Sequence, residues 1–361
     1  MARDADAAKA GATSRRLRTE VDRLLQRGLK GLEYLGSPAP VVGTTPKTLL
    51  LRRGTLGLYH YKPQQSEIYR VPLLLVMATT NKAYIFDLAP GQSLVEFLLQ
   101  RGYDVYVMDW NAPAPSERGL RLEDYVLGFI PDCIARVQRH SGEAELTLAG
   151  YCFGGVLALL YTALHDGAGL RNLVCFTTPL DFSQMTLFRA LSDARHFDVD
   201  KLCDRVDLVP AEMVIAGFDA LRPAGRIAGQ LRLWDNMWND DYVKGYRMME
   251  RWGAETLPLA SEYFRQIVKE LMQGNALHQG TLRIGARLVE LERVRLPLLH
   301  VIAQHDHIVP PPCARPLLQR VGSRDKQEVM LSGGHVSLVA GANAVKRMWP
   351  TLDQWLQARS T

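Results

Sequence analysis

The hexapeptide GYCFGG at residues 150–155 restricts the fold of this chain more than any other feature of its sequence. It directly follows the apolar run LTLA and opens the run VLALLYTALH, so a short buried strand meets a helix at this point. Glycines on both sides of Cys152 allow a turn so sharp that the side chain points out over the end of a sheet. The pattern is GxSxG with cysteine in place of serine, and it predicts a nucleophile elbow.

The chemistry expected of Cys152 follows from the helix that begins beside it. The positive end of that helix and its free N–H groups stabilise a thiolate and a developing oxyanion. A buried cysteine in a glycine-rich turn is the alternative for an isolated GxCxG, but strand, turn and helix are in register here, and we predict that Cys152 is catalytic. The other cysteines are scattered without a CxxC pair, which predicts reduced thiols, no disulfide framework and no metal site; they are Cys133, Cys175, Cys203 and Cys313.

Short apolar runs alternate with helical patterns on both sides of the elbow. After a hairpin-like region at residues 48–61, the predicted strands lie at residues 73–78, 105–108, 146–149, 173–177, 298–303 and 327–331. The predicted helices lie at residues 91–100, 122–139, 154–164 and 344–356. This alternation is typical of a mostly parallel sheet flanked by helices, and together with the elbow it predicts an α/β-hydrolase fold.

The alternation fails for more than a hundred residues after residue 177. This stretch contains Trp234, Trp238 and Trp252, several methionines and a longer helical pattern at residues 259–272. An insertion after the sixth strand is where this fold usually carries a lid. We therefore divide the chain into four parts: an N-terminal tail with an amphipathic helix (1–46), a first part of the core (47–179), a cap or lid (180–291) and a second part of the core (292–361).

The N-terminal segment begins with small polar residues and continues as a basic amphipathic pattern. The small polar residues 1–14 are expected to form a tail without regular structure. Residues 17–35 carry leucine and valine at helical spacing, with arginine and lysine between them, which predicts an amphipathic basic helix. Such a helix either packs on the domain or binds a partner or a hydrophobic granule, because periodicity does not separate these roles. We favour the packed helix.

Composition argues against several classes of protein. Hydrophobic residues make up 47% of the chain and charged residues 22%, and no apolar run approaches the roughly 18 residues of a membrane-spanning helix. The first residues lack the apolar stretch of a secretory signal, so we expect a cytoplasmic protein. The formal net charge of +5 is mild and dispersed, which argues against nucleic-acid binding and suits an anionic substrate such as a coenzyme A thioester.

A nucleophile at the elbow needs an acid and a histidine that follow it in chain order. Asp306 stands just after the strand LLHVIA, in QHDHIVPP, and His335 just after the strand EVML, in SGGHVSL. Both fall at the carboxyl ends of parallel strands, where α/β sheets place their ligands. We predict His335 as the base and Asp306 as its partner, with His307 as a candidate assisting residue.

The oxyanion hole is expected to combine two backbone N–H groups. One belongs to Phe153, directly after the nucleophile. The other belongs to the loop after residues 73–78, at Thr79, Thr80 or Asn81. The sequence leaves open which of these three donates.

From about residue 49 to its C-terminus the chain resembles polyhydroxyalkanoate synthases, and by length the short subunit of the two-component class III type. The resemblance rests on GYCFGG together with a strand that ends in DW, the segment TTPLDF and the loop HDHIVPP followed by GGH, supported by NKAYIFDL, GYDVYVMDW and LEDYVLGFI. The chain departs from the short synthases at Tyr151 and Phe153, where Ile and Gln are usual, and at Asn111, where Gly is common. An aromatic residue after the cysteine is typical of the longer, single-component synthases, which leaves the subclass open.

The resemblance implies a polymerase that takes acyl groups from (R)-3-hydroxyacyl-CoA, expected to be 3-hydroxybutyryl-CoA, onto Cys152 and releases CoA. It implies that His335 deprotonates the thiol and that Asp306 helps to activate the hydroxyl that attacks the bound chain. It further implies association with polyester granules, no cofactor, a homodimer and a second synthase subunit of the PhaE type.

Two alternatives remain beside this interpretation. A cysteine α/β-hydrolase of the acyl-CoA thioesterase or dienelactone hydrolase type has the same triad and elbow but usually lacks a large cap. A non-catalytic scaffold would usually have lost the triad, whereas all three members are present here.

Overall fold

The computed structural model describes the backbone of residues 2–361 and the side chains of residues 18–361. The chain divides into two compact units. One comprises residues up to Val41 together with Arg222–Arg251, and the other comprises Val42–Leu221 with Trp252–Thr361. The second unit contains the central sheet and all of the predicted site residues, and we call it the catalytic unit.

The catalytic unit is built on an eight-stranded sheet in the order β1-β2-β4-β3-β5-β6-β11-β12. Its strands are β1 (Lys47–Arg53), β2 (Leu56–Tyr61), β3 (Leu73–Val76), β4 (Val105–Trp110), β5 (Leu146–Tyr151), β6 (Leu170–Phe176), β11 (Leu298–Ala303) and β12 (Lys326–Leu331). The hairpin β1–β2 pairs antiparallel with β4, and all later neighbours pair in parallel. This order, with a long insertion after β6, is that of the α/β-hydrolase fold.

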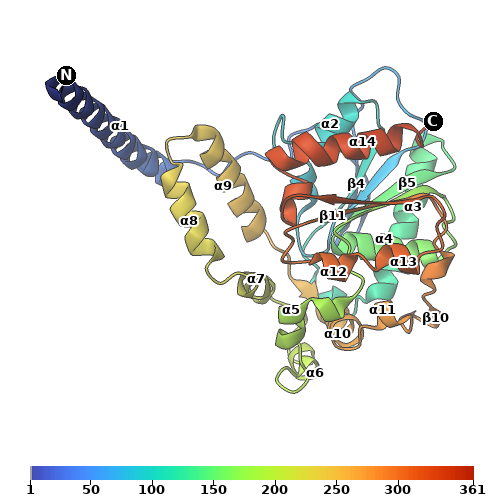
Figure 1. Cartoon of the computed structure of the whole chain (residues 1–361). Helices are drawn as coiled ribbons and strands as arrows, with labels where there is room; N and C mark the ends of the chain where they lie inside the picture. The colour runs from blue at the N-terminus through green and yellow to red at the C-terminus, as the bar shows by residue number, and fades with distance from the viewer. Residues whose placement is uncertain (1) are drawn as a thin grey trace. The chain divides into compact units, whose positions relative to one another are not determined.

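The strands at the centre of the sheet are more buried than the strand at its edge. All residues of β3, β5 and β11 lie inside, as expected for parallel strands covered on both faces, whereas β1 at one edge is mostly exposed. In Figure 1 the strands lie between α2 and α14 on one side and α4 on the other. The bounds of these helices are α2 (Leu94–Gln100), α4 (Phe153–Leu164) and α14 (Trp349–Gln357). A further helix, α3 (Ile130–Ser141), directly continues the π-helical segment η3 (Asp124–Phe129).

The insertion after β6 folds mainly into short helices. Within the catalytic unit these are η4 (Phe182–Gln184), α5 (Thr186–Leu191), α6 (Val199–Cys203), α7 (Ala211–Ala220), α10 (Ser261–Gln266), η5 (Ile267–Gln273), α11 (Ala276–Gln279) and η6 (Leu291–Arg293). Two pairs of two-residue strands accompany them, formed by β7 (Leu208–Val209) with β8 (Leu259–Ala260) and by β9 (Arg283–Ile284) with β10 (Arg287–Leu288). The last part of the chain adds α12 (Pro311–Ala314), α13 (Leu317–Arg320), η7 (Val336–Leu338) and η8 (Ala344–Met348). Two further single turns are η1 (Ala83–Phe86) and η2 (Pro115–Glu117).

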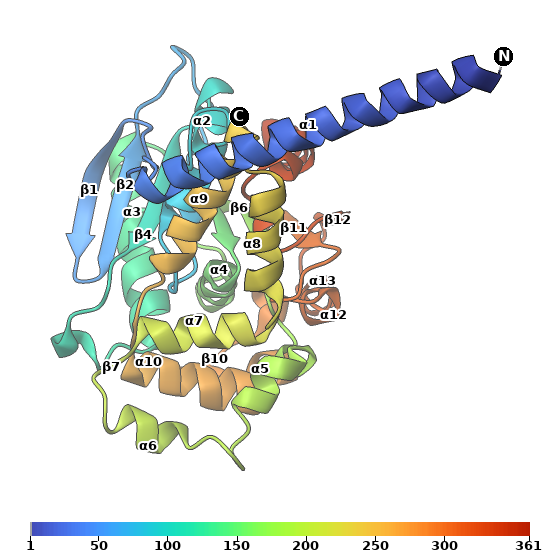
Figure 2. The same ribbon diagram turned by 90° about the vertical axis from the view of Figure 1, so that its left-hand side faces the viewer.

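The other unit consists of α1 (Ala2–Gly36), α8 (Gly225–Asp235) and α9 (Asp240–Ala254, whose last residues belong to the catalytic unit). Figure 2 shows α8 and α9 beside the C-terminal half of α1. Lys30 of α1 lies 3.0 Å from a carboxylate oxygen of Asp240, and the Tyr34 hydroxyl donates to Glu250 at 2.7 Å. These polar contacts join the N-terminal helix to helices of the insertion.

The N-terminal helix differs from its prediction in two respects. It begins at Ala2, so the prediction of an irregular tail is wrong for residues 2–14; the alanine-rich sequence there has high helix propensity, and Met1 lies outside the described residues. The leucines of its apolar stripe are exposed rather than packed, and they are Leu24, Leu25, Leu29, Leu32 and Leu35. Among the described residues, no helix is long and apolar enough to cross a membrane.

Candidate active site

Cys152 stands between β5 and α4 in a backbone conformation that few residues adopt. Its φ of 55° and ψ of −123° lie outside the regions that L-residues normally occupy. The turn is held by the Cys152 N–H, which donates to the Phe176 carbonyl oxygen at 2.8 Å, and by the Gly155 N–H, which donates to the Cys152 carbonyl oxygen at 3.0 Å. The strained turn leaves the Cys152 side chain half-buried at the start of α4, as the elbow motif predicts.

The glycines of the elbow are required by close packing. A Cβ at Gly150 would overlap the backbone of Gly154 and Gly155 on the other side of the turn. A Cβ at Gly154 would overlap the backbone of Val76 and Met77 at the end of β3. The first turn of α4 therefore lies against the strand that leads into the loop Thr79–Asn81.

Asp306 and His335 meet beside the elbow, in the loops that follow β11 and β12. The His335 ring is hydrogen-bonded through Nδ1 to Asp306 Oδ2 at 2.7 Å, and both side chains are buried. The second carboxylate oxygen, Asp306 Oδ1, accepts the N–H groups of Ile308 at 2.9 Å and Val309 at 2.8 Å. These bonds fix the carboxylate, which in turn fixes the imidazole with Nε2 free to face another group.

The second nitrogen of His335 faces the nucleophile, since the histidine side chain also hydrogen-bonds to Cys152. Burial lowers the pKa of His335, but the negative charges of Cys152 and Asp306 and their hydrogen bonds outweigh it and raise that pKa to about 10. The surroundings of His335 therefore favour its protonated form.

Tyr151 packs against His335. Its ring centroid lies 5.1 Å from that of His335, and its hydroxyl donates to the His335 carbonyl oxygen at 3.3 Å. In the sequence, Tyr151 stands out only as a departure from the short synthases. No local signal reveals this contact, because the two residues are 184 positions apart.

The other four cysteines are buried, and desolvation raises the pKa of each of their thiols. For Cys175 the pKa rises to about 12. Such thiols stay protonated at neutral pH and are weak nucleophiles. Among the described side chains, no group of three or more His, Cys, Asp or Glu residues could hold a metal ion.

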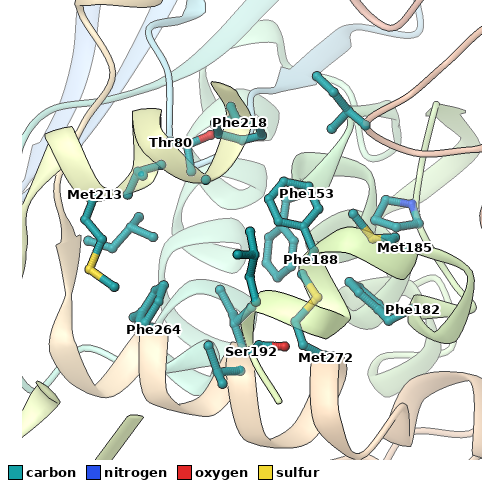
Figure 3. A pocket seen from close by; sticks show the side chains of 18 of the residues that line it. Thr80, Phe153, Phe182, Met185, Phe188, Ser192, Met213, Phe218, Phe264 and Met272 are labelled. Atoms are coloured by element: carbon teal, nitrogen blue, oxygen red, sulfur yellow. The ribbon is translucent and has the colours of Figure 1, made fainter. Parts of the chain in front are cut away.

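A cavity of about 460 Å³ opens beside Cys152 and Phe153 within the catalytic unit. Figure 3 shows its lining of phenylalanine and methionine side chains from the insertion: Phe182, Met185, Phe188, Met213, Phe218, Phe264 and Met272. The polar side chains in its lining are those of Cys152, Thr79, Thr80 and Ser192. The nucleophile thus faces an apolar space large enough for a ligand well above the size of water.

The loop predicted to complete the oxyanion hole reaches the same cavity. Thr79 and Thr80 line it together with Phe153, whose N–H lies in the first turn of α4. The Asn81 N–H instead points back into its own loop and donates to the Ala78 carbonyl oxygen at 3.4 Å. Geometry therefore favours Thr79 or Thr80 over Asn81 as the second donor. His307 is exposed, beside Asp306 in the chain.

Comparison with known proteins gives two matching family descriptions. The first is "alpha/beta hydrolase fold", over residues 85–342, and the second is "Poly-beta-hydroxybutyrate polymerase (PhaC) N-terminus", over residues 39–98. "Poly(3-hydroxyalkanoate) polymerase subunit PhaC" from Allochromatium vinosum is 33% identical over 345 residues, covering 94% of this chain and 96% of that protein. The chain belongs to the poly(3-hydroxyalkanoate) polymerase family.

Other polymerase subunits agree with this assignment. The subunit from Thiocystis violacea is 31% identical over 93% of this chain and 94% of its own length. The subunit from Haloferax mediterranei is 32% identical over 88% of this chain, which spans only 65% of that longer protein. The prediction that the chain is a polyhydroxyalkanoate synthase, and therefore an acyltransferase, is confirmed by its family.

Solved structures confirm the predicted fold of this polymerase. Monoglyceride lipase from Saccharomyces cerevisiae matches with a TM-score of 0.53 at 15% identity, over 90% of this chain and 97% of that one. Monoacylglycerol lipase from Paleococcus ferrophilus matches with a TM-score of 0.51 at 18% identity, over 84% and 99%. At this identity the likeness concerns the α/β-hydrolase fold alone.

Proposed function

We propose that this polymerase transfers (R)-3-hydroxyacyl groups from coenzyme A to a growing polyester through a covalent acyl-Cys152 intermediate. The observation that carries the proposal is the chain of contacts from Asp306 through His335 to Cys152, at the mouth of an apolar cavity. A thiolate accepts an acyl group from a thioester at little energetic cost, because one thioester replaces another.

In the first half-reaction His335 takes the thiol proton and the Cys152 sulfur attacks the thioester carbonyl carbon. The resulting oxyanion is stabilised by the N–H of Phe153 and by that of Thr79 or Thr80. The carbon–sulfur bond to CoA then breaks, and the leaving thiolate takes the proton from His335. In the second half-reaction the hydroxyl of an incoming hydroxyacyl-CoA attacks the chain bound to Cys152, and His335 takes its proton with support from Asp306. The bond between the acyl carbon and the Cys152 sulfur then breaks, and the sulfur takes the proton from His335, which leaves the lengthened chain on CoA.

The apolar cavity supports polymerisation over hydrolysis. A water molecule that reached acyl-Cys152 would release free hydroxy acid, so elongation requires that water be excluded. The phenylalanine and methionine lining offers few groups to hold water, and it provides room for the acyl part of the substrate. The alternative of a cysteine thioesterase or dienelactone hydrolase would need water at this position.

Partners and location follow from the same proposal. We expect a homodimer, a second synthase subunit of the PhaE type and association with granules in the cytoplasm. The exposed leucines of α1 support a role of that helix at one of these surfaces.

The deciding experiment supplies purified protein with (R)-3-hydroxybutyryl-CoA and follows CoA release and product size together. We expect CoA release with polymer as the product, and nearly none from Cys152→Ser, since an unperturbed hydroxyl is a much weaker nucleophile than a thiolate. Free 3-hydroxybutyrate as the main product would overturn the polymerase assignment in favour of the hydrolase. Wild-type CoA release by Cys152→Ser would overturn the nucleophile.

A further inference from the structure

We infer that the segment 252–263 of the insertion holds the loop 79–82 in place and that Tyr263 positions the backbone donor of the oxyanion hole. This inference rests on the proposed function, because it concerns the amides that would stabilise the oxyanion on Cys152. Tyr263 is thereby assigned as a positioning residue that acts through Thr79.

Four hydrogen bonds join the two segments, one at each residue of the loop. The Tyr263 hydroxyl is 3.0 Å from Thr79 Oγ1, and the Leu257 N–H donates to the Thr80 carbonyl oxygen at 2.7 Å. Asn81 Nδ2 donates to Thr256 Oγ1 at 3.2 Å, and Trp252 Nε1 donates to the Lys82 carbonyl oxygen at 2.9 Å. Consecutive residues of the loop are thus hydrogen-bonded to a segment that lies 170 to 184 positions later in the chain.

The far end of the loop has its own anchor on the sheet. Lys82 Nζ lies 2.6 Å from Asp109 Oδ2 at the end of β4 and also donates to the Trp110 carbonyl oxygen. The Ala83 N–H donates to Asp109 Oδ1 at 2.8 Å. Because these bonds already secure residues 82–83, the bonds from the insertion matter most for Thr79 and Thr80, which reach the cavity.

The contact between the hydroxyls of Tyr263 and Thr79 is buried in the protein. The residue is fully buried, and its ring centroid lies 6.0 Å from that of Phe153 and 4.5 Å from that of Tyr125. Thr79 is buried too, so loss of the bond between the two hydroxyls leaves a polar group without its partner away from water. The Thr79 side chain then regains rotational freedom, and the peptide unit that follows it loses its fixed direction. An oxyanion donor works only when that direction is set before the reaction.

The experiment compares Tyr263→Phe, Thr79→Val and the double variant in single-turnover acylation of Cys152 by (R)-3-hydroxybutyryl-CoA. We expect each single variant to slow acylation by about 10- to 100-fold, below the 10²- to 10³-fold effect of deleting a donor outright. The double variant should be no slower than the worse single variant, because both changes remove one contact. The Kd of a thioether analogue of the substrate should stay unchanged. Tyr125→Phe, which removes a hydroxyl from the neighbouring buried ring, serves as the matched control with unchanged acylation.

A second readout needs no catalysis. Hydrogen exchange of the backbone amides at residues 79–81 should be faster in Tyr263→Phe than in the wild type and unchanged in Tyr125→Phe. Equal exchange in Tyr263→Phe and the wild type, or additive rate losses in the double variant, would overturn the inference. If the wild type forms no acyl-Cys152 while the loop amides still respond to Tyr263→Phe, the proposed function fails and the positioning of the loop stands.

Discussion

His335 carries a charge that depends on its neighbours. Burial lowers the pKa of His335, whereas Cys152 and Asp306 raise it, with a net result of about 10. With an ordinary value of 6.5, the stabilisation by the protonated ring is fully present below pH 6.5 and is lost as the pH rises through about 10. The charge of His335 therefore depends on both of its side-chain partners, Cys152 and Asp306.

We predict that Cys152→Ala lowers the pKa of His335. The variant removes one of the two groups that raise this pKa while burial and Asp306 remain, so the balance shifts toward the neutral ring. The ring proton shifts in NMR spectra of histidine-labelled protein measure this pKa as a function of pH. Cys133→Ala should leave it unchanged, because Cys133 is not among the groups that shift it. The same pKa in Cys152→Ala and the wild type would show that sulfur and imidazole are not paired.

Asp306 offers a second test at the scale of single residues. If its main role is to support activation of the incoming hydroxyl, Asp306→Asn should still be acylated, and acyl-Cys152 should accumulate and be visible by intact mass. His335→Ala should show no such adduct, because the base is needed for the first step. Failure of acylation in Asp306→Asn as complete as in His335→Ala would instead make Asp306 an orienter of the histidine from the start.

Among the secondary-structure elements, α4 approaches the end of β3 at Gly154. We predict that Gly154→Ala destabilises the protein by about 1–3 kcal/mol, the usual range for overpacking, and lowers the acylation rate, because the new Cβ meets the backbone of Val76 and Met77 and not a flexible side chain. Urea unfolding followed by circular dichroism measures the first effect.

The matched control is Gly245→Ala, inside α9. A Cβ at Gly245 meets nothing within 4 Å, so this variant should be neutral or more stable by up to about 1 kcal/mol. An equal free energy of unfolding for Gly154→Ala and the wild type would mean that the elbow can shift away from β3 at no cost.

On the scale of the whole molecule, the insertion is expected to act as a mobile cap over Cys152. Its helices α5, α7 and α10 contribute Phe188, Met213 and Phe264 to the cavity, so the thioester and the growing chain of the proposed reaction would have to pass these side chains. We predict that amides at 180–221 and 252–291 exchange measurably in the free enzyme and slow down with a thioether analogue of the substrate. Slow exchange that the analogue leaves unchanged would indicate a fixed channel to Cys152.

The sequence determined the features that depend on neighbouring residues. The elbow follows from glycines next to Cys152, and the strands follow from short apolar runs; β11 occupies Leu298–Ala303 as predicted. The chain order of nucleophile, acid and histidine fixed Asp306 and His335 as candidates, because parallel strands bring their carboxyl ends to one edge. Local conformation and strand direction are properties that a short stretch of sequence carries by itself.

The contacts of the insertion depend on how distant parts of the chain pack together. In the sequence the insertion is marked by three tryptophans, but none of them lines the cavity, which is lined mainly by phenylalanine, methionine and aliphatic side chains. Trp234 and Trp238 are 45% exposed, and Trp252 donates a hydrogen bond to the Lys82 carbonyl oxygen. Residues 222–251 belong to a unit with α1 and not to the catalytic unit. The bond from Tyr263 to Thr79 joins residues 184 positions apart. Such contacts are set by how distant elements pack, and composition and periodicity carry no information on which distant partner a side chain will meet.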